Sequence, residues 1–220
     1  MISHSAPVSA SSNARSSRVS TRHLEGIILA AGESRRMGYP KPLLDIGGRT
    51  FIEHIAETML AVVPRLMIVI GAHRERMRAA IPRDARIAIV ENPNYARGQL
   101  SSLQAGLDAL QLEAAGALVH LGDHPLVRVE TFRAIVDSYN RTGQPIVIAR
   151  HDGHRGHPLI FDRAIFGELR SAPEEEGARY VVNADASRVA YVDLPDSGIN
   201  LDLDTPSDLA RAGLRSPPKA

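Results

Sequence analysis

Short apolar runs alternate along the chain with stretches in which apolar residues recur every three or four positions. The short runs predict buried strands at residues 26–31, 65–71, 86–90, 117–121, 145–149, 157–161 and 189–193. The periodic stretches predict helices at residues 51–62, 73–81, 101–110, 129–139, 162–169 and 175–183. Thr50 can cap the first of these helices, and Ser101 or Ser102 the third. A capping box at residues 205–208, with Pro at the first helical position, predicts one more helix near the end of the chain.

The alternation of strands and helices predicts the fold class. An α/β domain of this kind places helices on both faces of a mostly parallel central sheet, with right-handed crossovers between neighbouring strands. The length of 220 residues suits one such domain, which we assign to residues 24–214. The pattern is less regular over residues 150–200. We expect that stretch to form one side of a cleft rather than a separate domain.

The two ends of the chain differ from the rest. Residues 1–23 contain eight serines and three arginines, no acidic residue and no apolar core of a signal peptide. A transit peptide has a similar composition, but a disordered extension is the simpler interpretation. Residues 215–220 are expected to be a frayed C-terminal tail.

Composition and charge exclude several classes of function. The chain has no Cys, which rules out disulfides, thiol catalysis and cysteine metal sites. Its 26 basic and 25 acidic residues give no broad positive field for a nucleic acid. No apolar run approaches the roughly 18 residues of a membrane span. We therefore expect a cytoplasmic protein that binds neither nucleic acid nor membrane.

A loop of small residues follows the first predicted strand, with the sequence LAAGESRRMGYPK at residues 29–41. Ligands bind beyond the carboxyl ends of strands in sheets of this type, and small residues at 30–32 allow the backbone to approach phosphates. Arg36 and Lys41 add positive charge for a triphosphate. The spacing matches neither a Walker A loop nor a Rossmann fingerprint, and an ordinary glycine-containing turn is the alternative.

Two acidic segments could hold a divalent cation. Asp123 follows the strand at 117–121, in the sequence GDHP, where a carboxylate can bind Mg²⁺ against phosphate oxygens. Asp202 and Asp204 alternate along LDLDTP, so both carboxylates face one side, which is costly without a cation or hydrogen bonds. The alternative roles are a turn before Pro125 and the capping of the last helix.

Two polar segments could complete a ligand site. Residues 92–103 form a loop that enters a predicted helix, an arrangement suited to contact with a base or a phosphate; a capped surface loop is the alternative. Residues 151–158 carry three histidines, at positions 151, 154 and 157. Their spacing matches no usual zinc pattern, so we interpret this segment as a polar acceptor loop.

Together these segments resemble the molybdopterin nucleotidyltransferase-like family. Residues 29–41 match its signature LAAGxSxRMGxxK, and LAAG with Pro before Lys resembles the cytidylyltransferase branch more than the guanylyltransferase branch, which usually has LAGG. Residues 155–158 match its RGHP motif, 177–179 its Gly-Ala-Arg, and 202–209 resemble its DIDTPEDL. Two positions depart from the family: His124 stands where Gln is usual, and Gln99 where Met is usual. The resemblance covers about residues 26–210.

The resemblance implies a three-layer Rossmann-like nucleotidyltransferase fold and an assignment for each segment. It implies that Arg36, Lys41 and Asp123 are catalytic and that Asp123 and Asp204, with Asp202 as a second candidate, hold Mg²⁺. The implied nucleotide contacts are Leu29, Ala30, Ala31, Gly32, Ser34, Arg36, Lys41, Asn92, Gly98, Ser101 and Ser102. The implied acceptor contacts are His124, Arg155, Gly156, His157 and Arg179.

The reaction implied is transfer of a nucleoside monophosphate from an NTP, with CTP favoured, to a phosphorylated pterin-type molybdenum cofactor, with release of pyrophosphate. A molybdoenzyme would be the client. GTP, or a sugar or alcohol phosphate as acceptor, remains an alternative. A non-catalytic accessory protein that binds and delivers the cofactor is the alternative from another class.

Overall fold

The computed structural model describes residues 22–215. The predicted N-terminal extension therefore lies outside the described residues up to position 21, and the predicted tail does so from position 216. Arg22 belongs to the fold: its backbone N–H donates to Asn140, its guanidinium pairs with Asp162 and covers the ring of Tyr139. Arg22, which the sequence pattern placed in the extension, thus packs against the domain.

A seven-stranded sheet forms the centre of the molecule, in the order β5-β4-β1-β6-β8-β7-β9. The strands are β1 Leu24–Ala30, β4 Leu66–Ile70, β5 Ile87–Glu91, β6 Gly116–Leu121, β7 Ile146–His151, β8 His154–Asp162 and β9 Val189–Asp193. Only β8 runs against its neighbours in this sheet; the other pairs are parallel. The predicted mostly parallel α/β fold is confirmed.

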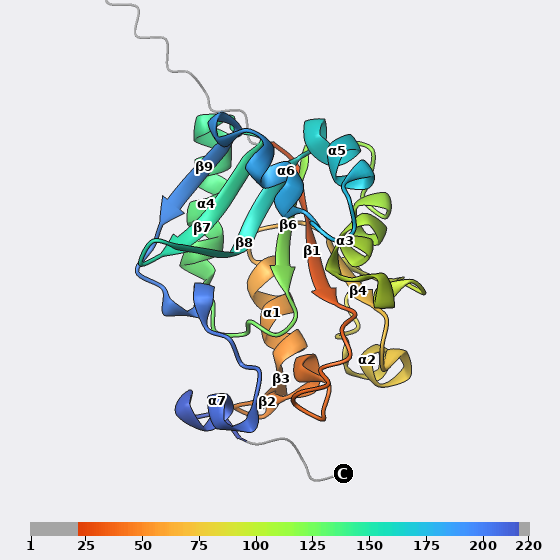
Figure 1. Cartoon of the computed structure of the whole chain (residues 1–220). Coiled ribbons are helices and arrows are strands. Elements are labelled where there is room, and N and C mark those ends of the chain that lie inside the picture. The colour runs from red at the N-terminus through yellow and green to blue at the C-terminus, as the bar shows by residue number, and fades with distance from the viewer. Residues whose placement is uncertain (1–21, 216–220) are drawn as a thin grey trace, which may run out of the picture.

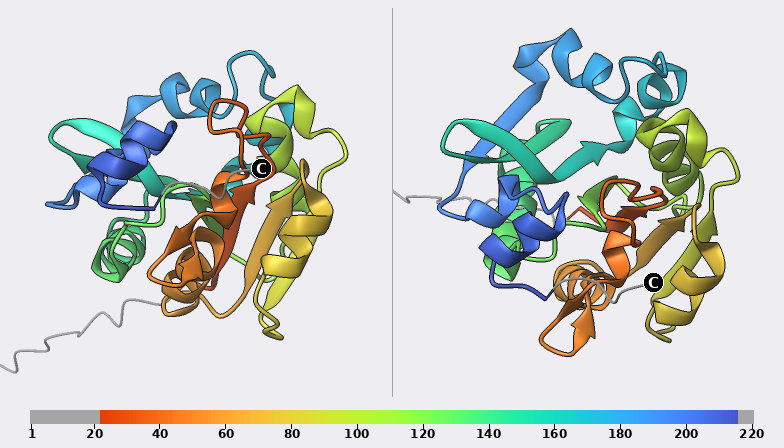
Figure 2. Two further views of the ribbon diagram at one scale, coloured as in Figure 1. Left: turned by 90° about the horizontal axis from the view of Figure 1, so that it is seen from below. Right: turned by 60° about the horizontal axis from the view of Figure 1, so that its bottom comes forward.

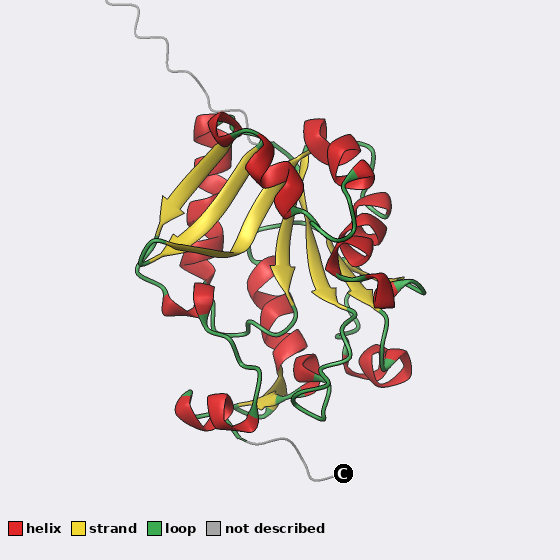
Figure 3. Ribbon diagram, in the orientation of Figure 1, coloured by secondary structure: helices red, strands yellow, loops and turns green. Residues whose placement is uncertain are grey.

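Helices cover both faces of the sheet (Figures 1 and 3). One face packs against α1 Phe51–Leu60, α2 Arg74–Ala80 and α4 Val129–Thr142. The other packs against α3 Gln99–Asp108, α5 Phe166–Ser171 and α6 Arg179–Ala184. Strand alternation divides the apolar residues between the two layers: in β1, Ile28 faces the first and Ile27 the second. No helix within residues 22–215 is long and apolar enough to cross a bilayer.

Two local structures differ from the sequence expectation. Helix α3 begins at Gln99 rather than after Ser101, because Gly98 adopts φ 108°, a conformation that lets the chain turn into the helix early. The predicted loop at 151–158 is instead a tight hairpin between β7 and β8. Asp152 and Gly153 both have positive φ at its turn, as an Asp-Gly pair favours.

A third, smaller apolar cluster lies at the end of the sheet where the parallel strands terminate. It joins Met37 and Leu44 of the loop after β1 to Phe51 of α1, and to Leu203 and Leu209 near the last helix, α7 Pro206–Arg211. A short hairpin of β2 Asp45–Ile46 and β3 Arg49–Thr50, which the apolar pattern did not reveal, lies next to it. Figure 1 shows α7 and this hairpin at the same end of the molecule, and Figure 2 views that end from below. The cluster therefore fixes the C-terminal segment against the loop after the first strand.

The seating of α3 on the sheet can be tested at Gly106. A Cβ at this position would lie 2.7 Å from Ile27 Cγ2, a stiff β-branched side chain of β1. We expect Gly106→Ala to lower the free energy of unfolding by about 1–3 kcal/mol through overpacking, although Ala favours a helix. The matched control is Gly167→Ala in α5, where a Cβ would meet no atom within 4 Å. It should be neutral or stabilise by up to about 1 kcal/mol in urea denaturation. Equal effects of the two changes would contradict this packing.

Candidate functional site

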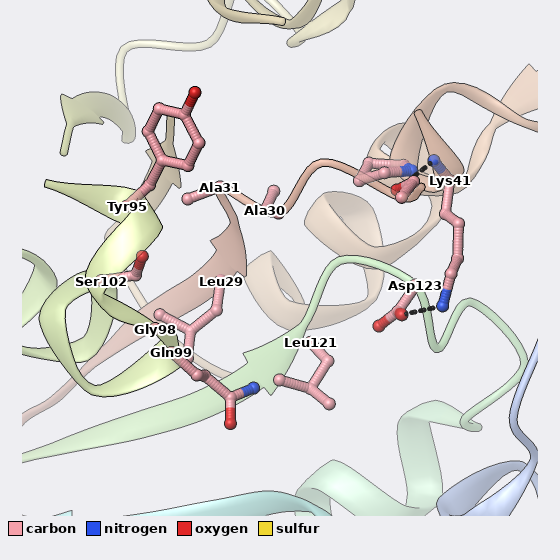
Figure 4. Close-up of a pocket in the computed structure, with 13 residues that line it drawn as sticks. Leu29, Ala30, Ala31, Lys41, Tyr95, Gly98, Gln99, Ser102, Leu121 and Asp123 are labelled. Carbon is pink, nitrogen blue, oxygen red and sulfur yellow. Dashed lines mark hydrogen bonds and ion pairs between the residues drawn. The ribbon is translucent and has the colours of Figure 1, made fainter. Parts of the chain in front are cut away.

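A cleft of about 290 Å³ lies beyond the carboxyl ends of β1 and β6 (Figure 4). Its walls come from three places in the chain: the loop after β1, the turn that leads into α3, and the residues that follow β6. The lining residues are Leu29, Ala30, Ala31, Gly32, Ser34, Lys41, Pro42, Tyr95, Gly98, Gln99, Ser102, Leu121 and Asp123. Parallel strands therefore bring the predicted nucleotide loop and Asp123 to one cavity.

The loop after β1 is shaped by its own hydrogen bonds. Ser34 has φ 53°, and its hydroxyl accepts a 3.1 Å hydrogen bond from the backbone N–H of Lys41, which closes the loop. Gly122 lets the turn after β6 approach the last residue of β1, since a Cβ there would lie 2.9 Å from Ala30 Cβ. At Gly32, by contrast, a Cβ would meet no atom of the described residues within 4 Å. The packing of the protein does not require glycine at position 32, whereas the close approach of a ligand would.

Lys41 lies between two carboxylates at the edge of the cleft. Its Nζ is 2.7 Å from Asp123 Oδ2 and 2.6 Å from Asp204 Oδ1, so these two oxygens are at most about 5.3 Å apart. Arg36 Nη1 lies 2.7 Å from the other oxygen of Asp204. Residues that are 82 and 163 positions away from Lys41 in the sequence thus meet at one ammonium group.

The two carboxylates are positioned by different means. Asp123 follows β6 directly, so the sheet fixes it. Asp204 precedes the capping box of α7, in which the Asp208 carboxylate accepts from the backbone N–H of both Asp204 and Thr205. The capping box expected from the sequence therefore also holds the backbone of Asp204 in place. Asp202 does not join the pair: its side chain is 80% exposed, and His124 lies 4.0 Å away.

The charges in this cluster shift one another's pKa. Burial alone would raise the pKa of Asp123, but the Lys41 ammonium, and His124 beside it, hold that pKa below its usual value. Burial alone would likewise lower the pKa of Lys41, but Asp123 and Asp204 raise it. Lys41 and Asp123 are therefore both charged at neutral pH.

The donor set suits a hard divalent cation that brings other ligands with it. Within residues 22–215, no three His, Asp or Glu side chains converge on a common metal position. Mg²⁺ usually binds through one or two carboxylates together with substrate phosphates and water rather than in a complete protein cage. The Asp123 and Asp204 carboxylates, which the Lys41 ammonium bridges in this structure, fit that pattern.

The polar loop at 92–98 uses part of its chemistry internally. The buried Asn92 amide donates to Ser101 Oγ at 2.9 Å and to Ser102 Oγ at 3.0 Å. Ser101 Oγ in turn donates to the carbonyls of Asn94 and Gly98. Gly98 and Ser102 line the cleft, whereas Asn92 and Ser101 support the loop from behind. Tyr95 and Gln99 also line the cleft; sequence reasoning did not select them, although both lie in the segment it identified.

A second cavity of about 640 Å³ adjoins the cleft and shares Leu29 and Gln99 with it. Its floor is apolar and includes Val119, Ile148, Leu159 and Phe161. Four of the predicted acceptor residues line it: Arg155, Gly156, His157 and Arg179. Glu174, Glu175 and Glu176 also line it and were not foreseen. Glu174 pairs with Arg97 and so ties the α5–α6 connection to the turn before α3.

Among the predicted acceptor residues, Gly156 has a clear packing role and His124 has a different position from the rest. A Cβ on Gly156 would lie 2.3 Å from the carbonyl oxygen of Ile199, so glycine is required where β8 passes the 3₁₀ turn Ser197–Asn200. His124 does not line the second cavity. It lies between Asp123 and Asp202 with 10% of its side chain exposed, and its buried Nδ1 has no hydrogen-bond partner among residues 22–215.

Three histidines meet beside the second cavity, which His157 lines. The ring centroids of His120, His124 and His157 are 6.2–6.3 Å apart, and His120 Nε2 is 2.9 Å from the carbonyl oxygen of His124. Desolvation lowers the pKa of His157 to about 3 and holds that of the fully buried His120 well below 6.5. At neutral pH these two imidazoles are therefore uncharged.

Comparison with known proteins finds one family model, two curated relatives and a crystal structure that each match most of this chain. Residues 26–189 match the family model described as MobA-like NTP transferase domain. The chain is 28% identical to molybdenum cofactor cytidylyltransferase of Escherichia coli, covering 86% of this chain and 95% of that protein. It is 31% identical to nicotine blue oxidoreductase of Paenarthrobacter nicotinovorans, covering 84% and 94%. The crystal structure of Rv0371c from Mycobacterium tuberculosis superimposes with a TM-score of 0.76 at 28% identity, covering 87% and 98%; a manganese complex of Rv0371c gives 0.66.

The two uncharged imidazoles predict how stability depends on pH. Below pH 6.5 the unfolded chain binds a proton at each histidine, whereas folded His120 and His157 stay neutral. The free energy of unfolding should therefore fall as the pH drops from 6.5 towards 3, by about 1.4 kcal/mol per pH unit for His157, and His120 should add a decrease in the same direction.

Urea denaturation of the wild type and of His157→Gln, measured from pH 8 to pH 4, tests this dependence. The variant should show a slope shallower by about 1.4 kcal/mol per pH unit below pH 6. The difference between the two proteins at pH 8 measures lost packing separately, because imidazoles are neutral there in both states. Identical slopes would contradict the assignment.

Proposed function

Since the chain belongs to the MobA-like NTP transferase family, we propose that it transfers CMP from CTP to a molybdopterin-type molybdenum cofactor and releases pyrophosphate. The observation that carries the proposal is the meeting of Lys41, Asp123 and Asp204 at the edge of a cleft lined by the LAAG loop. A domain that only bound a nucleotide would not need two carboxylates at the point where a triphosphate enters.

The site supports an in-line transfer without a covalent enzyme intermediate. A phosphate oxygen of the acceptor forms a bond to the α-phosphorus of CTP, and the bond from that phosphorus to the bridging oxygen of the β-phosphate breaks. The electron pair leaves with pyrophosphate. The protein contributes position and charge: the triphosphate would lie along the loop 30–34, and Lys41 and Arg36 would neutralise it.

Asp123 and Asp204 would hold Mg²⁺, which supplies charge neutralisation at the reacting phosphates when bound. The relative Rv0371c has been crystallised with manganese, which supports a divalent cation in this family. The shared wall of Leu29 and Gln99 lets the acceptor enter from the second cavity, where Arg155 and Arg179 would meet its phosphate. The product would be delivered to a client molybdoenzyme. A cytoplasmic location would give the protein access to CTP.

The base and the acceptor are supported by similarity rather than by contacts. The LAAG sequence and the Escherichia coli cytidylyltransferase support CTP. GTP, a sugar or alcohol phosphate as acceptor, and a non-catalytic carrier role are the alternatives. The similarity to nicotine blue oxidoreductase adds a redox reaction as a second candidate from another class.

A turnover assay separates these functions. Purified protein is mixed with Mg²⁺, the molybdopterin-type acceptor and each NTP in turn, and pyrophosphate release is measured. The proposal expects release with CTP in preference to GTP. Preferential use of GTP would overturn the assignment of the base. No pyrophosphate release with any NTP would overturn the nucleotidyl transfer and leave the redox reaction and the carrier as the remaining candidates.

Asp123→Asn tests the chemistry with little change in side-chain volume. We expect kcat to fall by roughly 100-fold or more, the scale of losing a charged group that organises the transition state, while the far-UV spectrum stays unchanged. The matched control is Asp137→Asn on the exposed side of α4, which should keep wild-type kcat. Asp202→Asn shows in the same assay whether the exposed second carboxylate contributes. A folded Asp123→Asn variant with full turnover would remove Asp123 from the mechanism.

A further inference from the structure

The cations of the loop after β1 occupy the carboxylate pair in the free protein. Lys41 Nζ contacts one oxygen of Asp123 and one of Asp204, and Arg36 contacts the second oxygen of Asp204. Lys41 is only 12% exposed, whereas Arg36 is 75% exposed. Both oxygens of Asp204 and one of Asp123 are thus already paired with positive charge.

A divalent cation at these carboxylates would compete directly with Lys41. Mg²⁺ binds oxygen at 2.0–2.1 Å, so an ion held by the same two oxygens would occupy the space of an ammonium that lies 2.6–2.7 Å from them. Two positive charges that close repel strongly in a partly buried site. The ion and Lys41 cannot both keep these contacts.

The described residues offer no third protein ligand to compensate for the exchange. No third acidic or histidine side chain within the described part of the chain joins the pair to form a metal position. A metal ion without nucleotide would gain two carboxylate oxygens as ligands, but the protein would lose the ion pairs that Lys41 and Arg36 make with them. A metal bound to a triphosphate would bring its own oxygens, and the phosphates would accept the displaced cations.

The loop allows Lys41 to move without unfolding. Its backbone is held by the hydrogen bond to Ser34 and by the turn in which Leu44 N–H donates to the Lys41 carbonyl. Only the flexible four-carbon side chain has to turn, and Lys41 already lines the cleft beside Gly32 and Ser34. Its ammonium can therefore exchange carboxylate for phosphate by rotation about side-chain bonds.

We propose that Lys41 is a built-in counter-cation for Asp123 and Asp204, which a divalent metal displaces efficiently only when it arrives with the triphosphate. The proposal rests on the proposed function and adds an order of events to it. Lys41 and Arg36 keep the empty pair neutral, and metal binding is coupled to nucleotide binding by exchange of ions.

Mn²⁺ titration of the free protein, without nucleotide or acceptor, tests this exchange. Free Mn²⁺ is followed by electron paramagnetic resonance or by calorimetry. Wild type should bind weakly, whereas Lys41→Met, which keeps most of the stem and removes the charge, should bind Mn²⁺ at least about tenfold more tightly, the factor that corresponds to about 1.4 kcal/mol. Mn²⁺ should also raise the melting temperature of Lys41→Met more than that of wild type, because the metal relieves the repulsion of the exposed pair.

Three further variants separate charge from side-chain shape. Lys41→Arg keeps a cation and should bind Mn²⁺ as weakly as wild type. Arg36→Gln frees one oxygen of Asp204 and should bind about threefold more tightly; it also serves as the test if Lys41→Met does not fold. Arg35→Gln is the matched control: this arginine is in the same loop and pairs with Glu33 instead of Asp204, so its loss should not change Mn²⁺ affinity.

The outcomes are distinct from those of the turnover assay. Mn²⁺ affinity that is unchanged or weaker in folded Lys41→Met would overturn the exchange, as would an equal gain in Arg35→Gln. If Lys41→Met does not fold, the same outcome in Arg36→Gln would overturn it. Because the titration uses metal alone, it stays readable if CTP or the pterin acceptor is the wrong substrate. A protein that releases pyrophosphate but shows no gain in Lys41→Met would keep its proposed function and lose the counter-cation.

Discussion

The contact of one ammonium with two carboxylates organises this molecule. Lys41 follows the first strand, Asp123 follows the fourth strand of the main sheet along the chain, and Asp204 precedes the last helix. Two half-buried carboxylates at most about 5.3 Å apart would destabilise the fold without a cation between them. The third apolar cluster acts with the ion contact, because Met37 and Leu203 pack the segments that carry Lys41 and Asp204 against each other. Apolar packing thus brings the three charged groups together, and their ion pairs hold the loop after β1 against the segment before α7.

The single antiparallel strand explains why two cavities lie side by side. Parallel strands place their carboxyl ends at one edge of the sheet, which is where β1 and β6 form the cleft. Because β8 runs the other way beside β6, its amino-terminal residues lie at that same edge: Leu159 pairs with Val119, and His157 lies just beyond. The Asp152–Gly153 turn then returns the chain from β7 at this edge. One reversal of strand direction therefore brings Arg155 and His157 next to the cleft without a separate acceptor domain.

Local sequence patterns predicted the strands and helices. Contacts between residues far apart in the sequence determined the direction of β8 and which motif residues line the cleft. Short continuous apolar runs predicted all seven strands of the main sheet, because strands buried on both faces require them. They could not reveal the direction of β8, which depends on a partner strand about forty residues earlier. The motif residues split in the same way: Gly98 and Ser102 line the cleft, while Asn92 and Ser101 bond to each other behind it. Strand alternation predicted that Asp202 and Asp204 face the same side. In the structure, the packing of Leu203 and Leu209 brings Asp204 to Asp123 and Lys41 and leaves Asp202 exposed.

The contrast between the two cavities bears on the class of acceptor. The cleft is small, and its walls are largely backbone and short side chains, which suits a triphosphate and a base held by main-chain groups. The second cavity is about twice as large; its floor is apolar, and both arginines and carboxylates stand at its rim. A sugar phosphate would leave that floor in contact with hydroxyl groups that find no partner there, at a cost for each unpaired group. A flat heterocycle with a phosphate arm would cover the floor, direct the phosphate to Arg155 or Arg179 and present its N–H edge to the glutamates. Under the proposed function, the apolar floor would therefore take the pterin ring, and the arginines at the rim would take its phosphate.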